Sequence, residues 1–205
     1  MLVEEVVTLA KHSELNGVAV KNDVPAIVSF INLGMVELYK RFTLNTKELV
    51  LDVTESYLSV PVPEDFMYPE RVYEWVVRNK ERKQVEVPIN EHYEFEGINF
   101  LNYKVINVSP ALVGKTIHIL YNTKPPKYYA NDLTVEVDLP ESLVDCLLHY
   151  VGYRGHLGVK SDGQSENNTH YLRFERSVFK AKELGITPTT QSLNMFNRVL
   201  NRGFV

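Results

Sequence analysis

Two adjacent carboxylates, Glu64 and Asp65, form the first stretch of this sequence whose residue types could carry chemistry. A hydrolase uses such a pair as general acid and general base. The pair follows two prolines, at positions 61 and 63, and prolines of this kind mark the edge of a sheet or the exit from it. The favoured interpretation is therefore a solvated turn, and a hydrolase using Glu64 and Asp65 is the weakest of the functions considered.

A second candidate lies in the stretch LPESLVDCLLHYVGYRGHLG, residues 139–158. Cys146 and His149 are three residues apart, and His156 follows two turns later, so a helix would place possible metal ligands along one side. No second close ligand pair accompanies them. The sequence also has no glycine-rich phosphate loop after a strand and no Gly-x-Ser-x-Gly elbow. We therefore expect no catalytic residues, no bound metal, no cofactor and no enzymatic activity.

Composition narrows the class of protein further. Cys146 is the only cysteine, so an internal disulfide is impossible, and its leucine-rich surroundings predict a small buried side chain. No apolar run approaches the roughly 18 residues that cross a bilayer. Glu4 and Glu5 stand where an export signal would carry lysine or arginine, so we expect folding in a reducing cytoplasm and no membrane contact. The net charge of −4 argues against a simple grip on nucleic acid.

The elements that must position these residues begin with two helices. Apolar residues at helical spacing predict a short amphipathic helix over residues 2–12. A second helix of about four turns is predicted up to Phe42, with Asp23 as N-cap and Pro25 in the first turn. Gly34 lies inside this helix and indicates close contact with another helix.

The apolar period then changes to that of strands. The span 47–125 predicts an antiparallel β subdomain of about five or six strands, because residues alternate locally between two faces. The first strand is expected to place Leu49, Leu51 and Val53 on one face and Glu48, Val50 and Asp52 on the other. A hairpin is expected with its turn at RNKERK, residues 78–83, and a further strand pair around the loop Pro110–Gly114.

Two more helices are predicted, over residues 139–158 and 166–184. Asp138 or Ser142 can cap the first, and Gly185 can end the second. Gly152 and Gly155 would let another helix approach closely. The apolar and aromatic positions that these helices contribute to a common core are Leu143, Leu147, Val151, Tyr171, Phe174 and Val178, with Arg154 on the same stripe.

The last segment differs in composition from the rest. Residues 185–205 contain two arginines and no acidic residue. After a Thr/Pro spacer they carry an apolar set, too short to be stable as a lone helix in water. This arm must therefore fold back on its own core or dock on another chain, with the following candidate docking residues: Leu193, Met195, Phe196, Val199, Leu200, Phe204 and Val205.

Together these elements predict an α+β fold. Residues 1–46 and 139–185 are expected to form a helical bundle core, residues 47–138 an inserted antiparallel β subdomain, and residues 186–205 an extended C-terminal docking arm.

Several phrases, in this order and spacing over residues 23–185, resemble the head-to-tail adaptor proteins of tailed bacteriophages, of the tail tubular protein A type. The first block is DVPAIVSFINLGMVELYKRF, followed by YLSVPVPEDF and VPIN. The second block is ILYNTKPP, then VDLPESLVDCLLHYVGYRGHLG, then NNTHYLRFERSVFKAKELG. The β region diverges from the family pattern, and the tail does not match it.

The resemblance implies a structural virion protein of the phage neck, assembled in the host cytoplasm. Such proteins form a homo-oligomeric ring, usually of twelve copies, below the portal, and link the portal protein to a tail or nozzle protein. The ring forms part of the channel through which double-stranded DNA passes without sequence-specific binding. Carried onto this sequence, residues 193–205 become the portal-docking arm, and the helices at 139–158 and 166–184 become the ring core.

One alternative from another class remains open. A carbohydrate- or protein-binding β module with a helical base would hold its ligand on aromatic residues such as Tyr73, Trp75 and Tyr93.

Overall fold

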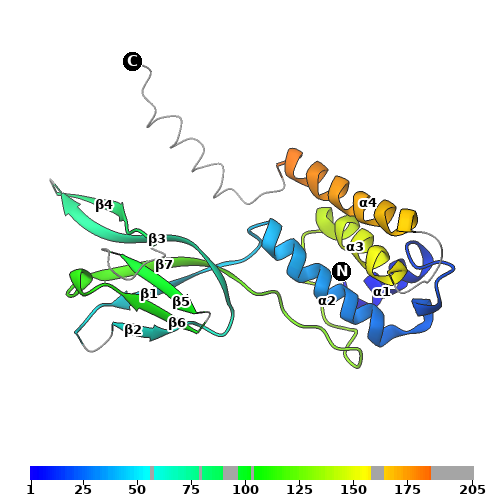
Figure 1. The fold of residues 1–205 in the computed structure, drawn as a ribbon, viewed down its shortest axis with the longest axis horizontal. Helices are drawn as coiled ribbons and strands as arrows, with labels where there is room; N and C mark the ends of the chain where they lie inside the picture. Colours follow the sequence, from blue (N-terminus) through cyan, green and yellow to red (C-terminus); the bar gives the residue numbers. More distant parts are fainter. Residues whose placement is uncertain (56–57, 79, 90–96, 103, 158–163, 186–205) are drawn as a thin grey trace, which may run out of the picture. The chain divides into compact units, whose positions relative to one another are not determined.

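The computed structural model describes residues 1–55, 58–78, 80–89, 97–102, 104–157 and 164–185 (Figure 1). The chain divides into two compact units, one made of Met1–Leu44 with Pro125–Val205 and the other of Asn45–Lys124. The first contains the α-helices and the second contains antiparallel sheets, so the predicted α+β class is confirmed.

The helical unit is arranged around one central helix. Its elements are α1 (Val3–His12), the 3-10 turn η1 (Ala19–Asn22), α2 (Val24–Arg41), the 3-10 turn η3 (Glu141–Leu143), α3 (Val144–His156) and α4 (Gln164–Glu183). Helix α3 packs against α4, α2 and α1. Figure 1 shows α3 and α4 side by side.

Two of the three predicted helix ends agree with the structure. The carboxylate of Asp23 accepts a hydrogen bond from the backbone N–H of Ala26 at 3.0 Å, so the predicted cap of α2 is confirmed. Gly185 follows α4 with a φ of +70°, as expected for a helix-ending glycine. The predicted caps of α3 are wrong, because a 3-10 turn precedes that helix and no side chain caps it. Asp138 instead accepts a hydrogen bond from the Tyr39 hydroxyl at 2.7 Å.

Glycines mark the closest approaches between backbone segments. A Cβ added at Gly34 would lie 2.6 Å from Leu147 Cδ1 of α3, so the predicted helix contact is confirmed. A Cβ added at Gly155 would lie 2.2 Å from Leu15 Cδ2. The sequence predicted that a helix would approach Gly155, but the residue that lies against it, Leu15, belongs to the segment after α1.

The segment 125–138 corrects the predicted domain boundary. It belongs to the helical unit, although the sequence analysis placed it in the β subdomain. The Asn32 side chain on α2 donates to the Tyr128 carbonyl at 2.9 Å and accepts from its N–H at 2.8 Å. The backbone N–H of Val3 donates to the Val135 carbonyl at 3.0 Å. These contacts satisfy backbone groups of a segment that lies outside both sheets, and they fix it to the helices.

The β unit contains seven strands in two sheets, among the residues described. The strands are β1 (Thr46–Asp52), β2 (Ser59–Pro61), β3 (Phe66–Arg78), β4 (Glu81–Glu86), β5 (Ile98–Asn102), β6 (Val105–Val108) and β7 (Thr116–Thr123). One sheet has the order β1-β7-β3-β4 and the other β2-β6-β5, and all these pairs are antiparallel.

Apolar side chains from both sheets form the core of this unit. They are Val53, Val72, Val87, Ile98, Ile106, Val108, Leu112, Ile117 and Ile119. Leu49 and Leu51 pack against this core while Val50 is exposed, so the predicted alternation of β1 is confirmed.

Two details of the predicted strand pairing need correction. The hairpin β3–β4 exists, but β4 begins at Glu81, inside the stretch expected to be the turn. The expected strand pair around Pro110–Gly114 is wrong, because β6 and β7 belong to different sheets. The 3-10 turn Pro110–Leu112 lies between them, and Leu112 is buried in the shared core, so this connection passes from one sheet to the other.

Candidate functional site

The residues predicted for a ring core lie mostly inside the helical unit itself. Leu143, Leu147, Val151 and Phe174 have no exposed surface, and Val178 is almost fully buried. Tyr171 is exposed and Arg154 is half-buried. The five buried side chains hold α3 and α4 in one core, so contacts with another chain must use other faces of these helices.

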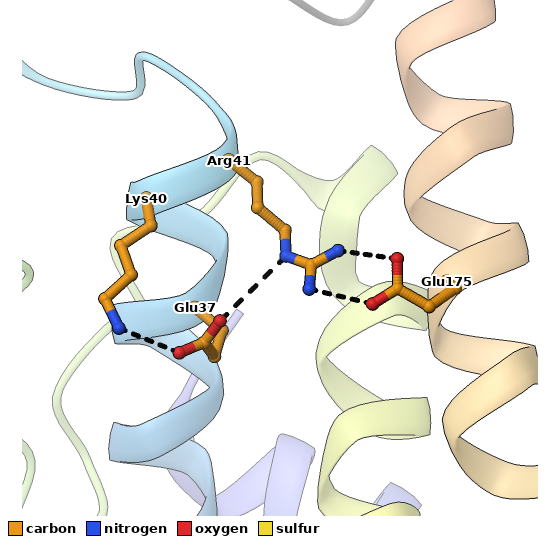
Figure 2. A network of polar contacts seen from close by, with 4 residues as sticks. All are labelled: Glu37, Lys40, Arg41 and Glu175. Carbon is orange, nitrogen blue, oxygen red and sulfur yellow. Dashed lines mark hydrogen bonds and ion pairs between the residues drawn. The ribbon is translucent and has the colours of Figure 1, made fainter. Parts of the chain in front are cut away.

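A polar network fixes α4 to α2 (Figure 2). The Arg41 guanidinium donates two parallel hydrogen bonds to the Glu175 carboxylate, at 2.7 and 2.8 Å. Glu37 lies 3.9 Å from Arg41 Nε and 2.9 Å from Lys40 Nζ. The Arg41 guanidinium also lies over the ring of Phe174, 4.8 Å from its centroid. Hydrogen bonds from Arg41 hold the pKa of Glu175 below its usual value, so this link persists well into the acid range.

Three histidines surround Glu14 where the segment after α1 meets α3 and α4. Glu14 Oε1 lies 3.5 Å from His149 Nδ1, and Glu14 Oε2 lies 3.6 Å from His170 Nδ1. The ring of His156 stacks on that of His170 with centroids 4.0 Å apart, and His156 Nε2 lies 3.0 Å from the Glu14 carbonyl oxygen. Two of these histidines lie on α3, His170 lies on α4, and Arg173 follows one turn later. Burial, followed by the charge of His156, lowers the pKa of His170 below its ordinary value of 6.5.

This cluster predicts a loss of stability in mild acid. Because the folded state resists protonation of His170, the unfolded chain binds this proton first as the pH falls. The contribution of His170 is complete above its unfolded pKa of about 6.5 and is lost as the pH falls through its lower folded pKa. We expect the melting temperature of the helices, followed by far-UV circular dichroism, to fall between about pH 7.5 and pH 5.5.

His170→Gln should flatten this pH dependence, whereas His12→Gln should leave it unchanged. His12 is exposed at the end of α1 and serves as the matched control. An identical slope in wild type and His170→Gln would show that His170 is not the group responsible.

The four-stranded sheet presents an aromatic outer face. Tyr73 stacks on His118 with ring centroids 5.1 Å apart, and Trp75 meets Tyr73 edge-on at 5.9 Å. Arg82 lies 4.8 Å over the Trp75 ring. The Tyr73 hydroxyl donates to Glu48, and this bond, followed by that of His118, lowers the pKa of the Glu48 carboxyl. Tyr73 and Trp75 lie on one face of β3, and Val72, which directly precedes Tyr73 and lies on the other face, is buried in the core.

The residues considered for catalysis or metal binding include Asp65, which forms polar contacts with its neighbours, and Cys146, which is buried. Asp65 accepts from Lys47 at 2.5 Å and from the Tyr121 hydroxyl at 3.1 Å, while neighbouring Glu64 is exposed. Cys146 is buried, as predicted, and burial raises the pKa of its thiol. In the part of the chain that the structure describes, no group of three or more potential ligands is placed to hold a metal ion. Among the described helices, none has both the length and the apolarity to span a membrane.

Some predicted residues fall outside the ranges that the structure describes. They are Tyr93 and the candidate arm residues Leu193, Met195, Phe196, Val199, Leu200, Phe204 and Val205. Sequence reasoning missed Glu14 and His170, which the structure brings together from segments 156 residues apart. The two residues share no local pattern that could have identified them.

A family model described as SU10 adaptor protein matches residues 2–194, so the match takes in the whole β unit and most of the helical unit. Among curated proteins, none matches this chain.

Proposed function

The chain belongs to the SU10 adaptor protein family, a family of phage head-to-tail adaptors, and from this premise we propose that copies of it form a ring joining the portal to the tail. The family is structural and is not an enzyme family, so the protein is a phage structural adaptor and a component of the virion. The match over residues 2–194 is the observation that carries the proposal.

The ring would be head-to-tail, with a different surface of each copy meeting its neighbour, and we propose twelve copies from the resemblance to tail tubular protein A. Such an interface closes when the rotation between neighbours is a whole fraction of a turn. Exposed apolar side chains on the helical unit support this proposal, since they are the kind of surface that association buries: Leu2, Leu9, Leu172, Phe179 and Leu184.

The family implies association with portal and tail proteins. We propose that the arm, residues 193–205, docks on the portal protein. Its sequence supports this, because an apolar segment without acidic residues is too short to be stable alone. Residues that line the ring would let double-stranded DNA pass without sequence-specific binding, and the net charge of −4 per copy would disfavour adhesion of phosphates.

The aromatic outer face of the β unit supports a role for that unit as well. Tyrosine, tryptophan and arginine are the residues that most often dominate binding energy at interfaces, and Tyr73, Trp75 and Arg82 lie together there. We propose that this face contacts the tail or nozzle protein. A carbohydrate would also fit an aromatic surface, and a change in Trp75 fluorescence on adding soluble glycans would favour that second function.

Electron microscopy of the chain co-expressed with the portal protein of its phage tests the proposal. We expect closed rings of the chain on the portal. A chain that stays monomeric beside an intact portal, at concentrations where the portal itself is assembled, would overturn the ring.

A further inference from the structure

The outer face of α4 has no partner in the described part of the chain. Leu172 and Phe179 are 51% and 63% exposed, and Arg176 lies between them on the same side of the helix. Arg173 and Lys180 flank this row on one side and are also exposed, Glu183 continues the row, and Glu175 on the other side is paired with Arg41. The face is therefore apolar along its centre, with Arg176 in the row and a basic margin on one side.

An edge of α1 has the opposite charge and the same layout. Leu2 and Leu9 are 37% and 45% exposed, and Glu5 lies between them. Glu136 lies next to this row because Leu2 and Glu136 form an isolated β-bridge. Glu136 also lies 3.4 Å from the amino group of Met1. The edge is therefore apolar along its centre, with Glu5 in the row and an acidic margin on one side.

The spacing of the two rows matches in the antiparallel direction. Each apolar pair is seven residues apart, or about 10.5 Å along a helix. In each row the charged residue lies three positions from one member of the pair, Glu5 from Leu2 and Arg176 from Phe179. If Leu2 faces Phe179, then Leu9 faces Leu172, and Glu5 faces Arg176.

We infer that neighbouring copies in the ring meet through the α4 face of one copy and the α1 edge of the next, in this antiparallel register. The inference rests on the proposed ring and names the two surfaces that build it. The two rows belong to different elements of one chain, so the contact is head-to-tail. Each copy uses its α4 face toward one neighbour and its α1 edge toward the other, which lets the ring continue.

Charge decides between a second copy and the chain's own arm as the occupant of the α4 face. Residues 185–205 carry Arg198 and Arg202 and no acidic residue. Like charges across an interface are costly, so the arm is disfavoured on a basic face. The α1 edge offers the Glu5 carboxylate opposite Arg176, and this favours a second copy.

A charge exchange tests the contact in the chain co-expressed with the portal protein. Arg176→Glu and Glu5→Arg should each lower the number of rings on portals at least about tenfold, because each places like charges opposite one another. The double variant, with Arg176→Glu and Glu5→Arg together, restores opposite charges and should recover most of the rings. Glu5 also accepts from the Leu2 N–H at 2.7 Å, so melting temperatures are measured for all variants to separate folding from assembly.

An apolar substitution gives an independent reading. Phe179→Ser should also reduce rings, whereas Leu33→Ser, at an exposed position of α2, should not. Normal rings from both Arg176→Glu and Phe179→Ser, or a double charge variant no better than the single variants, would overturn the inference and leave the ring standing. A wild-type chain that forms no ring on the portal would overturn both.

Discussion

Deleting residues 189–205 is expected to abolish association with the portal protein while the melting temperature of the remaining chain stays unchanged. All the buried side chains that the structure describes come from residues before this segment, so the deletion removes no described part of either core. The segment itself carries seven large apolar side chains and cannot form a stable helix alone. Co-elution of purified portal with wild-type and truncated chains, together with thermal melts, measures both effects.

Point substitutions show whether the apolar side chains of the arm carry the docking. Phe196→Ser and Leu200→Ser should each weaken portal association at least about tenfold, since truncating a buried anchor commonly costs 2 kcal/mol or more. Asn194→Ser, at a polar position of the same segment, should have little effect. Portal binding by the truncated chain at wild-type strength would refute the docking role of the arm.

The portal contact and the contact between copies should fail separately. The first depends on residues 193–205 and the second on exposed rows of α1 and α4. A chain without its arm keeps both rows, so its copies retain their mutual contact even when they lose the portal. Arg176→Glu keeps the arm, so single copies should still bind the portal. Counting bound copies per portal distinguishes these two failures.

The helices were the part of the fold that sequence could predict, because the signals that define them are local. The cap formed by Asp23 and the end at Gly185 each depend on neighbours within a few residues. The boundary near residue 125 could not be predicted in this way. It is set by Asn32 and Tyr39, which bind Tyr128 and Asp138 from about a hundred residues away.

The sheets show the same limit. Alternation correctly assigned the faces of β1, since burial on one side is a local pattern. It could not show that β6 and β7 belong to different sheets, because pairing depends on which edges meet in the folded unit. The candidate surfaces divide similarly. The sequence predicted the apolar stripe of α3 and α4. Phe174 is buried and Phe179 is exposed, and this difference depends on how the helices pack in the folded unit.

Phe174→Ala is expected to produce the largest loss of stability of any variant considered. The side chain is fully buried, and its ring centroid lies 5.2 Å from that of Tyr150. The Arg41 guanidinium lies over the Phe174 ring, 4.8 Å from its centroid. Removing a buried phenylalanine side chain leaves a cavity and costs about 3–5 kcal/mol. The loss should appear as a lower free energy of unfolding of the helices in urea, followed by far-UV circular dichroism.

Phe179→Ala is the matched control, because it makes the same chemical change five residues later on the same helix. Its side chain is mostly exposed, so the free energy of unfolding should change by no more than about 0.5 kcal/mol. If α4 contributes to a neighbouring copy, this variant should instead lose rings while keeping its fold. Two variants with equal losses of stability would show that both faces of α4 are buried within one chain, and a stable Phe174→Ala would show that α4 is not part of the core.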